Sequence, residues 1–185
     1  MNMITPKIVT NNNNSHYILM ASGKKTSCAS GWMQTLKLEL TKFNINLLCF
    51  DLIEPFIESH LINQWEVQIE KYSNYKNILI GGKSQGGRVA ALVAKKLNLQ
   101  KAFCIGYPFY TDEIKDNSRT TILIELNLSF KIIQGEFDRY GEKAIIENIT
   151  FPPNIALSWV PKEGHDLSNS IPHIAEELSF FHKNI

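Results

Sequence analysis

The sequence predicts an α/β fold: a three-layer structure in which helices cover both faces of a doubly wound sheet of about six mainly parallel strands. Six short runs rich in Ile, Leu, Val and Phe alternate with segments of helical period. Runs of this length that end at Gly, Asp or Pro are typical of strands buried on both faces. Strands that alternate with helices are joined by right-handed crossovers, which make the strands parallel.

The length and the composition favour one domain. The chain has 185 residues, of which 44% are hydrophobic, and no linker rich in Pro, Gly or Ser divides it. A chain of this length can build one sizeable core. We therefore expect a single domain over residues 1–185, in which residues 1–16 form an N-terminal extension.

The apolar runs define the strands. Right-handed crossovers predict the strand order 2-1-3-4-5-6, with a switch point beside the first and third strands. A further strand is expected near Lys7–Val9. The six main runs are Tyr17–Ala21, Asn46–Phe50, Asn77–Ile80, Ala102–Ile105, Phe130–Ile133 and Ile155–Val160.

The helices follow from apolar residues spaced three and four apart. In the first helix Ser30 is the expected N-cap, because its side chain can accept a hydrogen bond from the first turn. Only about two dozen residues lie between Gly106 and the strand that begins at Phe130, close to the minimum for a crossover, so no cap domain is expected. The predicted helices are Trp32–Phe43, Leu61–Tyr72, Val89–Leu97 and Ile174–Phe181, with weaker signals for Thr120–Leu126 and Glu142–Ile149.

Charge and hydropathy argue against several classes of partner. Nineteen Lys and Arg residues against 18 Asp and Glu residues give a formal charge of +1. A net charge this close to zero removes the usual electrostatic reason to expect a nucleic acid or a membrane surface as a partner. No apolar run approaches the roughly 20 residues that cross a bilayer. Met1–Ser15 has no basic segment followed by an apolar one, so we expect no cleaved secretion signal and a cytoplasmic protein.

The three cysteines agree with that expectation. Cys28, Cys49 and Cys104 are odd in number and lack the spacing of metal ligands. Cys49 and Cys104 fall inside apolar runs and are expected to be buried. We therefore predict three inert thiols in a reducing compartment.

The third predicted strand runs into Gly82-Lys83-Ser84-Gln85-Gly86, and a helix follows at once. The pattern G-x-S-x-G between a strand and a helix is a nucleophile elbow. The serine needs a strained turn that exposes its hydroxyl, and glycines are needed where the strand and the helix approach closely. A phosphate-binding loop is the alternative, but its Lys-Ser pair would follow the last glycine, whereas Lys83 and Ser84 precede Gly86.

Candidates for the base and the acid occur in loops at the same edge of the sheet. A serine nucleophile needs a base that a carboxylate orients, in the chain order Ser, Asp or Glu, His. The loop after the fifth strand holds Glu136 and Asp138, and we prefer Asp138 because it lies further into the loop and is shorter. The loop after the sixth strand holds His165. The other histidines, expected to be solvated surface groups, are His16, His60, His173 and His182.

These motifs together resemble the α/β-hydrolase superfamily, and more narrowly its small, lidless, dienelactone-hydrolase-like branch with the testis-expressed-hydrolase-like group. The resemblance covers most of the chain from Tyr17 onward and implies a catalytic triad of Ser84, Asp138 and His165. The motifs that carry it are Gly81–Arg88, Gly106-Tyr107-Pro108, Gln134-Gly135-x-x-Asp138 with Gly141, and Gly164-His165-Asp166.

One segment departs from that family. Its members usually have a His-Gly pair after the first strand, where the second oxyanion N–H originates, whereas this chain reads Met20-Ala21-Ser22-Gly23. The backbone N–H groups of Gln85 and Gly23 are the expected oxyanion donors. Loss of one such donor costs about 100- to 1,000-fold in rate.

The leading interpretation is a serine hydrolase that cleaves esters or thioesters of small soluble substrates. Tyr107 and Phe109 are expected to line the acyl site, and the mechanism requires neither a metal nor an organic cofactor. Without a lid, acyl chains of about two to four carbons should be preferred, because only covered methylenes add affinity. The alternative is a non-catalytic binding or scaffold protein on the same fold. Any protein partner is left open.

Overall fold

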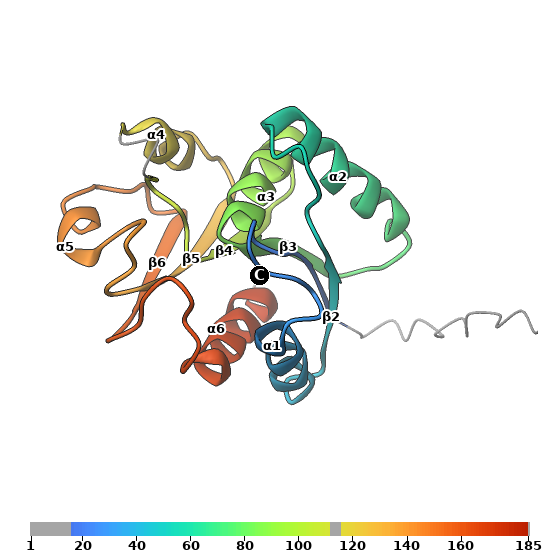
Figure 1. Cartoon of the computed structure of the whole chain (residues 1–185). Coiled ribbons are helices and arrows are strands. Elements are labelled where there is room, and N and C mark those ends of the chain that lie inside the picture. Colours follow the sequence, from blue (N-terminus) through green and yellow to red (C-terminus); the bar gives the residue numbers. More distant parts are fainter. Residues whose placement is uncertain (1–15, 112–115, 185) are drawn as a thin grey trace, which may run out of the picture.

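The computed structural model describes residues 16–111 and 116–184. The described strands form one parallel sheet in the order β2-β1-β3-β4-β5-β6, which confirms the predicted order (Figure 1). The expected strand near Lys7–Val9 lies outside the described residues. The strands are β1 (His16–Ala21), β2 (Ile45–Phe50), β3 (Ile78–Lys83), β4 (Lys101–Ile105), β5 (Ser129–Gly135) and β6 (Ile155–Val160).

Helices cover both faces of the sheet. The helices α1 and α6 pack on one face, and α2, α3, α4 and α5 lie on the other (Figure 1). In the described part of the segment between β4 and β5, α4 is the only helix, which agrees with the absence of a cap domain. The helices are α1 (Gly31–Thr41), α2 (Glu58–Lys71), α3 (Gln85–Lys96), α4 (Ser118–Ile124), α5 (Lys143–Ile146) and α6 (Ile171–Lys183).

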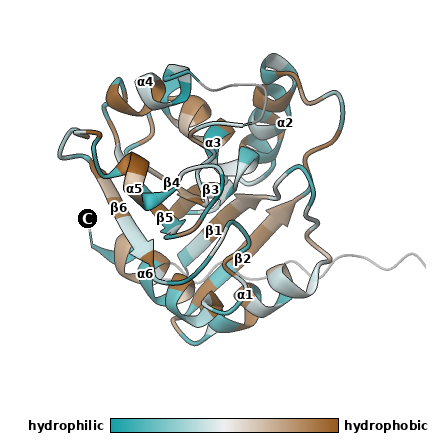
Figure 2. Ribbon diagram, turned by 60° about the vertical axis from the view of Figure 1, so that its left-hand side comes forward, coloured by the Kyte–Doolittle hydropathy of each residue, from teal (hydrophilic) through white to brown (hydrophobic). Residues whose placement is uncertain are grey.

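The core consists of two apolar layers, one on each side of the sheet. Figure 2 shows hydrophobic residues along the strands and on the sides of the helices that face them. Helix α1 begins where the sequence predicts, because the Ser30 hydroxyl caps it by accepting a hydrogen bond from the N–H of Met33. Within the described residues, no helix is long and apolar enough to span a membrane.

Most elements begin or end a few residues from their predicted bounds, and β3 and α5 are two examples. β3 continues three residues beyond Ile80, because Gly81 and Gly82 stay in register with Phe103 and Cys104 of β4. Glycine weakens a strand on its own, but here neighbours on both sides hold it in the sheet. The helix expected over Glu142–Ile149 is only the single turn of α5.

The prediction of three inert thiols is wrong for two of them. Cys28 and Cys49 form a disulfide, with 5.9 Å between their Cα atoms, that ties the loop after β1 to β2. Both residues are half-buried, so the prediction that Cys49 is buried is also wrong. Asp51 holds the loop there, because its carboxylate accepts hydrogen bonds from the N–H of Cys28 at 2.7 Å and the hydroxyl of Ser27 at 3.0 Å. Cys104 is free and buried, and burial raises the pKa of its thiol.

The histidines of the surface prediction divide into two groups. His173 is exposed, as expected. His182 is buried instead, because α6 packs against the start of β1, where the His182 Nε2 lies 3.1 Å from the carbonyl of Tyr17. His16, whose ring meets that of His182 edge-on, and His60 are both half-buried.

Candidate active site

Ser84 occupies a strained turn between β3 and α3. Its φ is 51° and its ψ is −120°, in the positive-φ region that residues other than glycine rarely adopt. Two backbone hydrogen bonds hold the turn: the N–H of Ser84 donates to the carbonyl of Ile105 at 2.8 Å, and the carbonyl of Ser84 accepts from the N–H of Arg88 at 3.0 Å. The strain is therefore stabilised by β4 on one side and α3 on the other.

The glycines of the elbow allow backbone to touch backbone. A Cβ atom on Gly82 would lie 2.6 Å from the backbone of Gly86 and Gly87, and one on Gly86 would lie 2.5 Å from the carbonyl oxygen of Ser22. Backbone atoms cannot move aside as a flexible side chain could. Both positions of the G-x-S-x-G pattern therefore exclude every larger residue, which is the physical basis of the motif.

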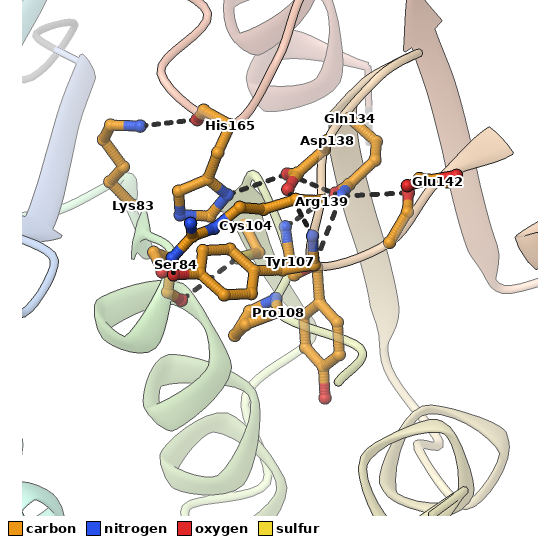
Figure 3. Close-up of polar contacts among 12 residues, drawn as sticks. Lys83, Ser84, Cys104, Tyr107, Pro108, Gln134, Asp138, Arg139, Glu142 and His165 are labelled. Atoms are coloured by element: carbon orange, nitrogen blue, oxygen red, sulfur yellow. Dashed lines mark hydrogen bonds and ion pairs between the residues drawn. The ribbon is translucent and has the colours of Figure 1, made fainter. Parts of the chain in front are cut away.

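The structure brings Asp138 and His165 together. The loop after β5 carries Asp138 and the loop after β6 carries His165, and their Oδ2 and Nδ1 atoms lie 2.8 Å apart (Figure 3). Asp138 is fully buried, whereas the imidazole remains 20% exposed. The ring of Tyr140 meets the imidazole edge-on, with 4.7 Å between the ring centroids. A buried carboxylate beside a partly exposed imidazole is the arrangement of an oriented general base.

Ser84 shares the sheet edge with this pair but is not hydrogen-bonded to it. Within the described chain, the hydroxyl of Ser84 makes no hydrogen bond, to His165 or to any other group. Catalytic hydrogen bonds of this kind are often long without substrate and tighten in the complex. The three predicted residues therefore lie at one edge, with one of their two expected hydrogen bonds formed.

The two expected oxyanion donors differ in whether their N–H groups are already hydrogen-bonded. The N–H of Gln85, at the start of α3, donates to none of the described residues. Gly23 lies beside the nucleophile, since a Cβ on Gly23 would be 3.4 Å from the Cβ of Ser84. Its N–H, however, donates to the Thr26 hydroxyl at 2.7 Å and is already engaged.

Sequence reasoning missed Gln134, the buried residue behind Asp138. Its Nε2 donates to Oδ2 of Asp138 at 2.8 Å, and its Oε1 accepts from the N–H of Tyr107 at 2.7 Å (Figure 3). The amide thus links the loop after β4 to the loop after β5. A glutamine at the end of a strand carries no signal of such a role, because the same residue type is common at the surface.

Lys83 was also missed as part of the site. It is 2% exposed, and its ammonium donates to the carbonyl oxygen of His165 at 2.9 Å. Arg139 is exposed and stacks over the ring of Tyr140, 4.5 Å from its centroid. Figure 3 shows both basic side chains around the Asp138–His165 pair.

A cavity of about 360 Å³ adjoins this edge, between the loop after β4 and the helices α4 and α5. Phe109, expected in the pocket, is one of its lining residues, as are Arg139 and Tyr140. Tyr107 is not: it is fully buried, and its hydroxyl donates to the carbonyl of Arg119 at 3.0 Å. Ser84 does not line the cavity either, whereas Tyr140 both lines it and meets the ring of His165 edge-on.

Comparison with known protein families shows to which family the chain belongs. The model of the alpha/beta hydrolase domain family matches residues 14–177. The chain belongs to this family. No curated protein gives a significant sequence match. The hydrolase fold, and with it the hydrolase class, agrees with the motifs described above.

Solved structures agree on the fold of this hydrolase. Est1E from Butyrivibrio proteoclasticus superposes with a TM-score of 0.74 at 12% identity, over 92% of this chain and 88% of that one. A serine hydrolase without a lid from Xanthomonas campestris gives 0.67 at 13% identity, over 91% and 83%. A serine hydrolase homologue from Coxiella burnetii gives 0.68 at 13% identity, over 90% and 84%. At these identities the likeness is evidence of fold, and the substrate has to be argued from the site.

Proposed function

We propose that this protein is a serine hydrolase that cleaves esters or thioesters of small soluble substrates through an acyl-enzyme on Ser84. The observation that carries the proposal is the 2.8 Å contact between His165 and the buried Asp138, at the sheet edge where Ser84 stands in a strained turn. Strain at a residue that packing does not require is a mark of function.

In this mechanism the hydroxyl of Ser84 attacks the acyl carbon while Nε2 of His165 takes its proton. Asp138 accepts the Nδ1–H of His165, which orients the ring and stabilises the imidazolium. The alcohol or thiol leaves with the proton from His165, and water then attacks the acyl-enzyme by the same route. The N–H of Gln85, at the positive end of the α3 dipole, is the first donor to the oxyanion.

The experiment combines a fluorophosphonate probe with p-nitrophenyl acetate. The unsubstituted protein should be labelled at one site and should turn over the ester. Ser84→Ala should lose both, because alanine fits the elbow but has no hydroxyl. His165→Ala should lose nearly as much, since nucleophile and base act as a unit, and Asp138→Asn should lose less. Full esterase activity in folded Ser84→Ala would refute the mechanism.

A non-catalytic scaffold is the second candidate, and one observation favours it. The N–H of Gly23 is engaged with Thr26, so the second oxyanion donor is occupied. A scaffold predicts no labelling by the fluorophosphonate probe in the folded protein, whereas the hydrolase predicts covalent labelling. The same measurement therefore separates the two functions.

The proposed substrate is a small acyl compound, and no nucleic-acid partner is proposed, because the charge of the chain is close to zero. We propose the cytoplasm as the location. Disulfides are rare there, so this location requires Cys28 and Cys49 to be reduced in the cell. Alkylation of thiols immediately on lysis should then modify both residues. Protection of both would place the protein in an oxidising compartment instead.

A further inference from the structure

Lys83 connects the two loops that carry Ser84 and His165. It is the last residue of β3, so its backbone is joined directly to Ser84. Its ammonium donates to the carbonyl oxygen of His165 at 2.9 Å (Figure 3). The ammonium also lies over the ring of Trp32 in α1, 5.3 Å from the centroid. One side chain thus spans from the elbow to the loop after β6.

Lys83 binds the backbone of His165 itself. In the described structure the Lys83 bond is the only hydrogen bond made by the backbone of His165. The ring has contacts of its own: Nδ1 contacts Asp138, and the ring of Tyr140 packs against it edge-on. One hydrogen bond holds the backbone of His165, and the other, together with the edge-on contact of Tyr140, holds its ring. Loss of the Lys83 bond therefore removes the hydrogen bond that sets the position of the backbone from which the imidazole projects.

Packing alone does not explain a lysine here. Lys83 is 2% exposed, and no carboxylate of the described residues forms an ion pair with it. Burial lowers the pKa of Lys83, and the charges of Asp166 and Asp138 oppose that shift only in part. Burying an ammonium is costly, and an apolar side chain of similar length would fill the space without that cost.

We propose that Lys83 is a positioning residue that holds the backbone of His165 in register with the Ser84 elbow. This inference rests on the proposed serine-hydrolase function. It places the effect of Lys83 on the rate of attack by Ser84, not on the affinity for substrate. A displacement of about 1 Å at a reacting group can cost on the order of 100-fold in rate, and a carbonyl released from its donor allows such a displacement.

The test compares Lys83→Met with a matched control, Lys101→Met. Lys101 makes the same kinds of contact at the opposite edge of the sheet: its ammonium donates to the carbonyls of Phe181 and Asn184 and lies 5.1 Å from the centroid of the Phe181 ring. Labelling rates with the fluorophosphonate probe, and kcat and KM with p-nitrophenyl acetate, should be measured for both variants. Thermal unfolding reports whether each variant is folded.

Lys83→Met should lower the labelling rate and kcat by about 10- to 100-fold with KM unchanged, because an interaction lost only in the reaction step leaves ground-state binding intact. Its Tm should not fall, because a buried charge is replaced by an apolar group. Lys101→Met should keep full activity. Lys83→Arg should recover part of the rate, since a guanidinium can also donate to the carbonyl.

The outcomes separate this inference from the function on which it rests. If the unsubstituted protein is not labelled, the hydrolase proposal fails and the role of Lys83 fails with it. If the unsubstituted protein is labelled and folded Lys83→Met reacts at the same rate, only the role of Lys83 is refuted. A rise in KM with unchanged kcat in Lys83→Met would also refute it.

Discussion

Replacing Gln134 with leucine should destabilise the fold more than a single glutamine usually does. The side chain is fully buried and makes four hydrogen bonds. Nε2 donates to Asp138 at 2.8 Å and to the carbonyls of Tyr107 at 3.3 Å and Gly141 at 3.5 Å, and Oε1 accepts from the N–H of Tyr107 at 2.7 Å. Leucine has a similar size but neither donates nor accepts. Gln134→Leu therefore removes all four hydrogen bonds and adds only apolar volume.

The magnitude follows from the groups left behind. The N–H of Tyr107 is buried with no other partner among the described residues, and a buried unsatisfied donor costs about 1–3 kcal/mol. Asp138 loses one hydrogen-bond donor but keeps its contact with His165, so it adds less to the loss of stability than an isolated buried carboxylate would. The sum is about 2–4 kcal/mol in the free energy of unfolding, out of the roughly 5–15 kcal/mol of a typical domain.

The assay is urea denaturation of Gln134→Leu beside a control, Gln64→Leu. Gln64 makes the same kind of clamp on the backbone of Ile53, at 2.9 and 2.8 Å, but its bonds are exposed. Water replaces those bonds, so the control should lose less than about 1 kcal/mol. Equal losses in the two variants would refute the reasoning, because burial would then have no effect on the cost of the missing amide.

Three further predictions concern pH, the disulfide and the substrate. Burial lowers the pKa of His182, so the unfolded chain takes up a proton first as the pH falls below about 6.5. The free energy of unfolding should therefore decrease as the pH falls below that value. His182→Gln can still donate to the carbonyl of Tyr17, and urea denaturation at several pH values should show that it loses this pH dependence. The same pH dependence in both proteins would contradict the assignment to His182. Cys28→Ser should cost about 3 kcal/mol for a loop of this length, and dithiothreitol should destabilise the unsubstituted protein alone. Acetyl and butyryl nitrophenyl esters should give the highest kcat/KM, and a steady rise through octanoyl and palmitoyl would mean that a covered channel exists.

The strands and their order were predictable because each leaves a direct trace in the chain. Strands buried on both faces are continuous apolar runs, and right-handed crossovers leave few ways to order them. Ser84, Asp138 and His165 could be proposed as site residues because each follows one of these strands at the same edge. The end of β3 was misplaced because two glycines look like a turn until the strands beside them are known.

Contacts between distant segments were not predictable in the same way. Cys28 and Cys49 are 21 residues apart, and nothing in either segment shows that the loop after β1 folds back onto β2. Lys83 and Gln134 belong to residue types that usually face water, and only their neighbours in space make them internal. The burial of His182 could have been predicted, because it follows Ile174 and Leu178 at intervals of four on the buried face of α6.

The hydrogen bond between Gly23 and Thr26 bears on which acyl compounds suit this protein. With the N–H of Gly23 engaged, Gln85 is the remaining one of the two expected oxyanion donors. Losing a donor raises the barrier to attack by about 2.7–4 kcal/mol. A thioester or an aryl ester offsets much of that barrier through its good leaving group, whereas an alkyl ester or an amide does not. Chemical reactivity of the substrate, more than its shape, should therefore decide what this site can hydrolyse.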